Sequence, residues 1–311
     1  MEAPELDFLF YPRSVAVIGA SNVPGKVGNA IMRSITLKYE GRVYAVNVRG
    51  GGEIEVNGRK FQVYRSVKEI PDEIDVAVIA VPAKFVPDVI DECGEKGVKG
   101  AVVISAGFKE AGRAELEEEL VRRARKWGIR VVGPPNCLGV TNLENGFDCN
   151  FNPPERQARP PTGKIAFMSQ SGAFGAAILD WAANHKIGMS KFISLGNMAD
   201  LDESDFMAYL GEDPKTGVIT GYIEGVKDGR KFFNTAREVT LRKPVIVLKS
   251  GRTEAGAKPP HPTRLTGRFL RHLPGGLHSG RRPRGKEHAP ALQLRQGIGH
   301  AEAREATALL S

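Results

Sequence analysis

The chain has 311 residues, of which 41% are apolar and 26% charged, and its formal net charge is +8 at pH 7. It is therefore long enough to bury the cores of about two soluble domains. The acidic start has no secretory pattern, and no apolar run approaches the roughly 20 residues that cross a bilayer, so we expect a cytoplasmic protein with no membrane partner. The three cysteines lack metal-type spacing, which argues against a disulfide framework and a metal site: Cys93, Cys137 and Cys149.

The excess positive charge is concentrated at the C-terminal end. Residues 259–311 contain nine Lys or Arg against three Glu, so this tail carries +6 of the +8 and the preceding residues are close to neutral. Nucleic-acid binding through the tail would depend on charge alone and would vanish at physiological salt. We therefore expect no nucleic-acid partner.

The first half of the chain alternates buried strands with amphipathic helices, which is typical of a parallel sheet covered on both faces. The predicted strands are 14–18, 42–47, 76–81, 101–105 and 130–132, and the predicted helices are 29–36, 86–96 and 113–127. In an open α/β sheet, ligands bind where the carboxyl ends of the strands meet. Five loops should therefore line one crevice for a large ligand: 19–28, 47–52, 81–84, 105–108 and 133–139.

The loop 19–28 joins a strand to a helix and is rich in glycine, a geometry that cradles a phosphate with backbone N–H groups. It is not a clean G-x-G-x-x-G, because its first two glycines lie six residues apart. After the second strand comes Asn47-Val-Arg49, where an NAD site would offer an acidic side chain to the ribose. This absence argues against an NAD(P)-dependent dehydrogenase. Arg49 suits a phosphorylated ribose, although a solvated arginine is an equally good interpretation.

The polar run 151–162 contains four prolines and is predicted to be an interdomain linker between domains at 1–150 and 163–258. The second domain again alternates strands (165–168, 191–195, 218–224 and 244–249) with helices (173–185, 204–210 and 229–242).

The stretch 163–175 reads as a strand, a turn Ser169-Gln-Ser-Gly172 and a helix. The N-terminus of that helix would attract an anion, and an ordinary helix cap is the alternative. Glu224 follows another strand at the same edge, where an exposed loop glutamate is again the alternative. His185 precedes Lys186 at a helix end and is interpreted as a helix-terminal residue.

Taken in order, these motifs resemble the α subunits of the NDP-forming acyl-CoA ligases, a family that includes ADP-forming acetyl-CoA synthetase and succinyl-CoA synthetase. No single motif is specific, but the ordered set spans residues 1–258. The stretches that carry the resemblance are 19–28, 44–47, 80–82, 104–108, 133–139, 169–174, 194–197, 222–225 and 243–252.

The resemblance implies a Rossmann-like CoA-binding domain, then a flavodoxin-like ligase domain, and the reaction acyl-CoA + ADP + phosphate giving acid + ATP + CoA. It implies that Ser169, Ser171 and Gly172 receive phosphate and that Glu224 orients a phosphohistidine. It also implies an ATP-grasp β subunit in a heterotetramer, with ADP or ATP and Mg²⁺ on that partner and no metal on this chain. The residues that it assigns to CoA are Gly19, Ser21, Gly25, Lys26, Val27, Gly28, Asn47, Arg49, Val81, Pro82, Ile104, Ser105, Ala106 and Asn136.

The chain departs from the family after Lys258. The family continues to Ser-His-Thr-Gly, whose histidine carries the phosphoryl group, whereas this chain has Pro-Pro-His-Pro-Thr-Arg. The codons for 259–264, read one base back, can encode Ala-Ala-Ala-Ser-His-Thr, and from this we infer a frameshift. The tail 259–311 contains no Val, Asp, Asn, Tyr, Trp or Met, so it is predicted to be disordered. His261 lies between prolines and is not expected to replace the lost histidine.

A second departure is the extra proline in Gly133-Pro-Pro-Asn136, which could distort a CoA loop. Two readings follow from these departures. In the first, the chain is a ligase α subunit that keeps CoA binding but is impaired in phosphoryl transfer. In the second, it is a non-catalytic CoA-binding module that uses its first domain alone.

Overall fold

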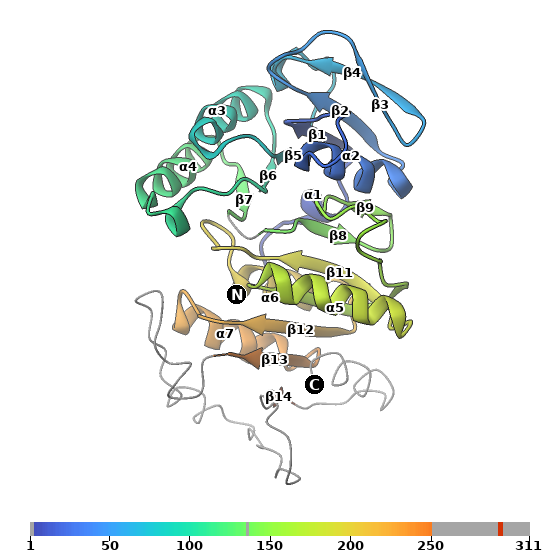
Figure 1. Ribbon diagram of the computed structural model, residues 1–311. Coiled ribbons are helices and arrows are strands. Elements are labelled where there is room, and N and C mark those ends of the chain that lie inside the picture. Colours follow the sequence, from blue (N-terminus) through green and yellow to red (C-terminus); the bar gives the residue numbers. More distant parts are fainter. Residues whose placement is uncertain (1–2, 135–136, 251–291, 295–311) are drawn as a thin grey trace.

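The computed structural model describes residues 3–134, 137–250 and 292–294. These residues form two sheets, each with helices on its faces, one above the other in Figure 1. The strand order is β3-β4-β2-β1-β5-β6-β7 in the first sheet and β14-β13-β12-β10-β11-β8-β9 in the second. The predicted α/β class is confirmed.

The first sheet follows the predicted alternation. Its central strands are continuous apolar runs that are buried on both faces, which requires helices on both sides. Helix α2 packs on one face, and α3 and α4 pack together on the other. The parallel strands are β1 (Ser14–Ile18), β2 (Arg42–Val46), β5 (Val76–Ile79), β6 (Gly100–Val103) and β7 (Arg130–Val132), and the helices are α2 (Val27–Lys38), α3 (Val86–Lys96) and α4 (Ala114–Lys126).

Sequence reasoning missed a hairpin at the edge of this sheet, formed by β3 (Glu53–Val56) and β4 (Arg59–Tyr64). The signal was present: Asn57-Gly58 lies between the two strands, and both residues have positive φ. Asn-Gly is the pair that favours this kind of tight hairpin turn. Three short 3₁₀ helices were also missed: η1 (Val67–Glu69), η2 (Ala83–Phe85) and η3 (Lys109–Ala111).

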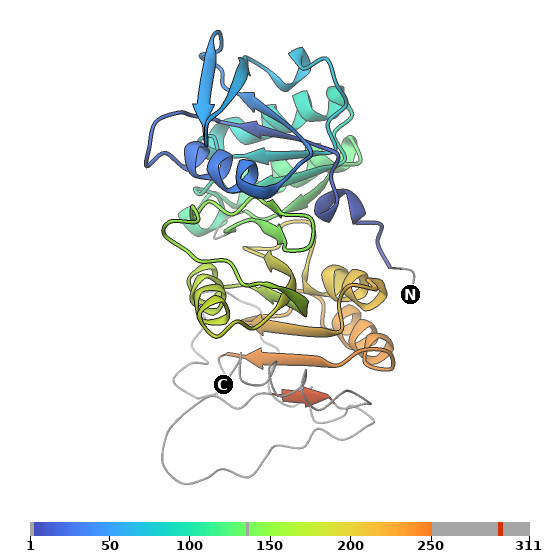
Figure 2. The same cartoon turned by 90° about the vertical axis from the view of Figure 1, so that its right-hand side faces the viewer.

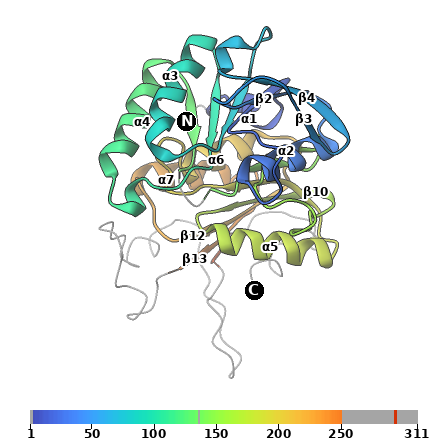
Figure 3. The ribbon, with the colours of Figure 1, turned by 45° about the horizontal axis from the view of Figure 1, so that its top comes forward.

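The second sheet has α5 on one face and α6 and α7 on the other, as Figures 2 and 3 show. Strands β10, β11, β12 and β13 run parallel, so their carboxyl ends share one edge. The elements are β10 (Thr162–Ser169), α5 (Gly172–Asn184), β11 (Met189–Ser194), α6 (Glu203–Glu212), β12 (Val218–Ile223), α7 (Gly229–Val239) and β13 (Val245–Lys249).

Both borders of this sheet are antiparallel. Strand β8 (Val140–Asn142) pairs with β11, and β9 (Phe147–Asp148) pairs with β8, although both precede the predicted linker. At the opposite border, β14 (Leu292–Leu294) pairs with β13. The rest of the tail, for which the sequence predicts disorder, lies outside the described residues.

A short N-terminal helix, α1 (Asp7–Phe10), packs between the two halves. Phe10 stacks on Tyr209 of α6 with ring centroids 5.0 Å apart. The linker is also anchored, because Arg159 forms an ion pair with Asp148 at 2.7 Å. The hydrophobic core that contains α1 continues from α2 to α6 without interruption, so the two halves are packed together and not merely tethered.

Candidate functional site

The carboxyl edge of the first sheet has a topological switch point between β1 and β5. After β1 the chain returns through α2 to β2 on one side, and it later crosses to β5 on the other. In open α/β sheets the loops diverge at such a point, which is where ligands bind. The predicted loops after β1, β2, β5, β6 and β7 all begin at this edge, which is where the CoA assignments lie.

The backbone of the glycine loop after β1 lies very close to the backbone of neighbouring segments. Gly19 has φ +98°, and a β-carbon on it would lie 2.5 Å from the Ala80 carbonyl oxygen. A β-carbon on Gly28 would lie 1.9 Å from the Gly19 carbonyl oxygen. Glycine at both positions lets the first turn of α2 approach the end of β1, which places the helix N-terminus at the crevice.

Hydrogen bonds fix this loop to the loop after β2. The Asn47 side chain donates to the Ala20 carbonyl at 2.9 Å and accepts from the Arg49 amide at 3.0 Å. The Asn29 side chain donates to the Ser21 carbonyl at 3.1 Å. Asn47 thus positions the turn that carries Arg49, whose side chain is exposed to solvent.

The other CoA assignments divide between solvent and core. Exposed at this edge are Gly25, Lys26, Val27, Pro82 and Ala106, whereas Val81 is half-buried. Ile104 and Ser105 are buried, so they cannot offer much surface to a ligand. Asn136 and the extra Pro135 lie outside the described residues.

The turn after β10 forms the second candidate site. Ser171 is the N-cap of α5, and its hydroxyl accepts from the Phe174 amide at 3.3 Å. Gly172 is the first residue of that helix. The Ser169 hydroxyl is buried and donates to the Ser171 carbonyl at 2.8 Å, so in this conformation it shapes the turn. The structure therefore contains both the helix cap and the helix N-terminus that an anion would use.

Glu224 lies beside this turn because β12 is the neighbour of β10. Ser169 pairs with Tyr222, so Ser171 and Glu224 each lie two residues beyond the paired positions. The Glu224 side chain is exposed and forms no hydrogen bond or ion pair within the described part of the chain.

Sequence reasoning missed Gln170, the residue between the two serines. Its side-chain oxygen accepts from the Glu224 amide at 2.8 Å and from the Gly225 amide at 2.9 Å. Its side-chain nitrogen donates to the Gly225 carbonyl at 2.6 Å. The sequence holds no signal for this role, because the partners lie more than 50 residues away.

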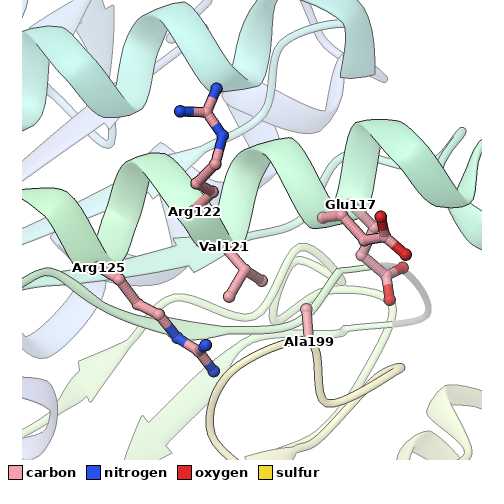
Figure 4. Close-up of a pocket in the computed structure, with 6 residues that line it drawn as sticks. Glu117, Val121, Arg122, Arg125 and Ala199 are labelled. Carbon is pink, nitrogen blue, oxygen red and sulfur yellow. The ribbon is translucent and has the colours of Figure 1, made fainter.

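The two candidate sites are connected through the turn that follows β11. Its Ala199 amide donates to the Gly133 carbonyl at 3.1 Å, in the loop after β7. Its Asn197 side chain donates to Glu117 of α4 at 3.3 Å, and burial raises the pKa of Glu117. Figure 4 shows Ala199 facing the side chains of α4 across a hollow that is also lined by Glu117, Glu118, Val121, Arg122 and Arg125. The turn thus touches both domains.

Two protein-family descriptions match successive parts of the chain. Residues 13–142 match the CoA binding domain, and residues 162–268 match the succinyl-CoA ligase like flavodoxin domain. The α subunit of acetate–CoA ligase [ADP-forming] I from Pyrococcus furiosus is 52% identical over 256 residues, which are 81% of this chain and 54% of that protein. The chain belongs to the ADP-forming acyl-CoA ligase family.

Other members of this family match the same part of the chain. Acetate–CoA ligase [ADP-forming] I from Archaeoglobus fulgidus is 52% identical over 81% of this chain and 36% of its own length. The solved structure of the Ca. Korarchaeum cryptofilum dinucleotide forming acetyl-coenzyme A synthetase 1, in complex with phosphate and ADP, has a TM-score of 0.75 and 46% identity over 82% of this chain and 53% of that one. The chain spans about half the length, or less, of these three relatives.

No helix in residues 3–134 and 137–250 is long and apolar enough to cross a membrane. Nor do the His, Cys, Asp and Glu side chains in residues 3–134 and 137–250 form a group of three or more that could hold a metal ion. Burial raises the pKa of the thiols of all three cysteines, which makes them poor ligands and poor nucleophiles.

Proposed function

We propose that this chain is the α subunit of an ADP-forming acyl-CoA ligase, which converts acyl-CoA, ADP and phosphate to acid, ATP and CoA through an acyl phosphate and a phosphohistidine. The observation that carries the proposal is that the N-termini of α2 and α5 lie at the carboxyl edges of the two sheets, and that the turn after β11 contacts loops at both edges. A CoA site alone would be compatible with many activities. A CoA site connected to an anion-binding site is what acyl and phosphoryl transfer require.

CoA would bind at the switch point of the first sheet. The close approach of Gly19 and Gly28 leaves backbone N–H groups at the helix N-terminus, which suits the pyrophosphate. Exposed Lys26 and Arg49 offer positive charge, and exposed Val27 offers an apolar contact. The remaining CoA assignments line the same edge, except Asn136, which is proposed from sequence alone.

Phosphate would bind at the turn after β10. The amides of Gly172 and Ala173 form no hydrogen bond within the described residues, so both can donate to a phosphoryl oxygen. Ser171 would add its hydroxyl. Glu224 would accept a proton from the far nitrogen of an imidazole, which makes the near nitrogen a better nucleophile toward phosphorus. This chain lacks the family's Ser-His-Thr-Gly segment, so we propose that its phosphoryl transfer is impaired.

The nucleotide would be held by a partner. The chain contains no G-x-x-x-x-G-K-[ST] motif, so we propose that an ATP-grasp β subunit binds ADP or ATP with Mg²⁺ and that the two subunits form a heterotetramer. Relatives named as α subunits support the existence of a partner subunit. We also propose that the protein acts in the cytoplasm.

The alternative is a non-catalytic CoA-binding module, and the segment after Lys258 is the observation that favours it. One experiment measures whether the chain still accepts a phosphoryl group and whether it binds CoA. The chain is incubated with its β subunit and ATP labelled on the γ-phosphate, and acid-labile phosphate on this chain is measured. CoA binding is followed in parallel by thermal unfolding.

We expect thermal stabilisation by CoA and little or no label on this chain. Label on His261 would overturn the proposed loss of phosphoryl transfer. Absence of CoA stabilisation would overturn both functions. Resequencing of the gene around codon 258 tests the frameshift separately, because an unambiguous in-frame read would contradict it.

A further inference from the structure

The Gln170 side chain forms hydrogen bonds to two loops besides its own, those after β11 and β12. It is 9% exposed, and its amide group joins the backbone of Glu224 and Gly225 through three hydrogen bonds of 2.6–2.9 Å. The same side-chain nitrogen lies 3.4 Å from the Met198 sulfur, as a donor to it. The backbone amide of Gln170 donates to the Tyr222 carbonyl at 3.1 Å.

The Met198 turn is held from a second direction. Met198 has φ +56°, which is uncommon for a residue other than glycine and costs free energy unless its surroundings fix it. The Lys227 ammonium donates to the carbonyls of Met198 and Ala199, at 3.0 Å each. Lys227 follows β12 in the same loop as Glu224. The loops after β10, β11 and β12 therefore form one hydrogen-bonded unit with Gln170 at its centre.

Glu224 itself depends on this unit. Since its exposed side chain has no hydrogen-bond partner in the described residues, only its backbone can set the position of its carboxylate. Catalytic groups need to be held within a fraction of an ångström, and such precision comes from supporting contacts.

We propose that Gln170 is a positioning residue, which holds the Glu224 loop and the Met198 turn in place beside the phosphate turn. The inference rests on the proposed function, because it gives Gln170 a role only if the turn binds phosphate. The alternative is a purely structural role, in which Gln170 only forms hydrogen bonds with buried backbone groups. That alternative predicts a loss of stability and no link to the charge of Glu224.

A double-mutant cycle separates the two roles. The full chain is titrated calorimetrically with inorganic phosphate at pH 8, where phosphate is a dianion, and separately with CoA. In the wild type, Glu224→Gln removes a like charge beside the phosphate, so we expect phosphate affinity to rise about fivefold, as for two unit charges about 4 Å apart in water. In the Gln170→Met background, the same substitution should change affinity less than about twofold, because the carboxylate is no longer held there.

The matched control is Gln157→Met. Gln157 is 2% exposed and is bonded at 3.0 Å to the Ala176 carbonyl and at 3.1 Å to the Asn150 side chain, but it contacts none of the three loops. In that background the Glu224→Gln effect should persist at full size. If Gln170→Met does not fold, Gln170→Asn replaces it. Its side chain is one methylene shorter and cannot reach the Glu224 and Gly225 backbone as glutamine does, so the Glu224→Gln effect should again fall below about twofold.

An unchanged Glu224→Gln effect in Gln170→Met or Gln170→Asn, or a lost effect in Gln157→Met, overturns the positioning role. A wild type that binds CoA but shows no Glu224→Gln effect on phosphate also overturns it and leaves CoA binding standing. A wild type that binds no CoA overturns the proposed function.

Discussion

Gly28 packs against Gly19 so closely that a β-carbon on Gly28 would lie 1.9 Å from the Gly19 carbonyl oxygen. Real carbon–oxygen contacts are never that short, so any side chain at this position forces α2 away from β1. The obstacle is backbone and cannot rotate aside. This single contact therefore ties the conformation of the CoA loop to the packing of the first domain.

We predict that Gly28→Ala lowers the free energy of unfolding by about 1–3 kcal/mol, as overpacking commonly does. It should also weaken CoA binding at least tenfold, because the helix N-terminus moves from the crevice. Urea unfolding and calorimetry with CoA measure the two effects. The control is Gly225→Ala, where a β-carbon meets no atom within 4 Å and φ is not positive. Equal losses in both variants would contradict the steric argument.

Arg49 tests the orientation proposed for CoA. Its exposed side chain follows the Asn47 turn, where it suits the 3′-phosphate on the ribose of CoA. Arg49→Ala should weaken CoA binding about tenfold, the worth of a charged hydrogen bond, and leave dephospho-CoA binding nearly unchanged. Competition between the two ligands measures the difference. Lys60→Ala, which removes an exposed cation from β4, is the control. If both ligands lose affinity equally, Arg49 does not contact that phosphate.

The buried ion pair between Lys191 and Asp213 is predicted to be costly to break. The two side chains are 0% and 3% exposed and lie 2.6 Å apart, at the junction of β11 and the end of α6. Lys191→Met leaves a buried carboxylate without its cation, which should cost about 3–5 kcal/mol of unfolding free energy. The double variant Lys191→Met, Asp213→Asn should recover part of that loss. At the exposed pair Lys68–Glu95, Lys68→Met should cost less than about 1 kcal/mol.

Glu203 should make the protein less stable as pH rises. Its carboxyl group is fully buried and has no hydrogen-bond partner among the described residues. Burial raises its pKa to about 7 and the charge of Asp202 adds to this, whereas the nearby backbone dipoles of Glu203 and Lys227 and the charge of Lys231 oppose it. The folded protein therefore keeps a proton that the unfolded chain loses above its ordinary carboxyl pKa.

The contribution of this bound proton to the free energy of unfolding is complete below the ordinary pKa of a glutamate and is lost as pH rises to about 7. We predict that the unfolding free energy of Glu203→Gln, taken relative to that of the wild type, is about 2 kcal/mol higher at pH 8 than at pH 5. Comparison of the two proteins cancels the titration of every other group. A constant difference across this range would show that Glu203 does not titrate there.

Much of the architecture could be predicted from the sequence. Apolar runs such as Ser14–Ile18 and Val76–Ile79 are long enough and pure enough to specify parallel strands buried on both faces, and the glycines at 19 and 28 marked the phosphate-type loop. The turn before α5 was visible as a cap pattern. Each of these depends on neighbours in the chain, whose preferences are written in consecutive residues.

Only the tertiary structure decided which loops meet. The pairing of Ser169 with Tyr222 places Glu224 beside the phosphate turn, and the hydrogen bonds of Gln170 link it to residues more than 50 positions away. Strand β8 joins the second sheet although it lies before the linker, because β11 has a free edge there, and β9 extends the sheet by pairing with β8. A hydrogen bond between distant residues leaves no periodic trace in the sequence, so the sequence determined the parts of this site and the fold determined how they are joined.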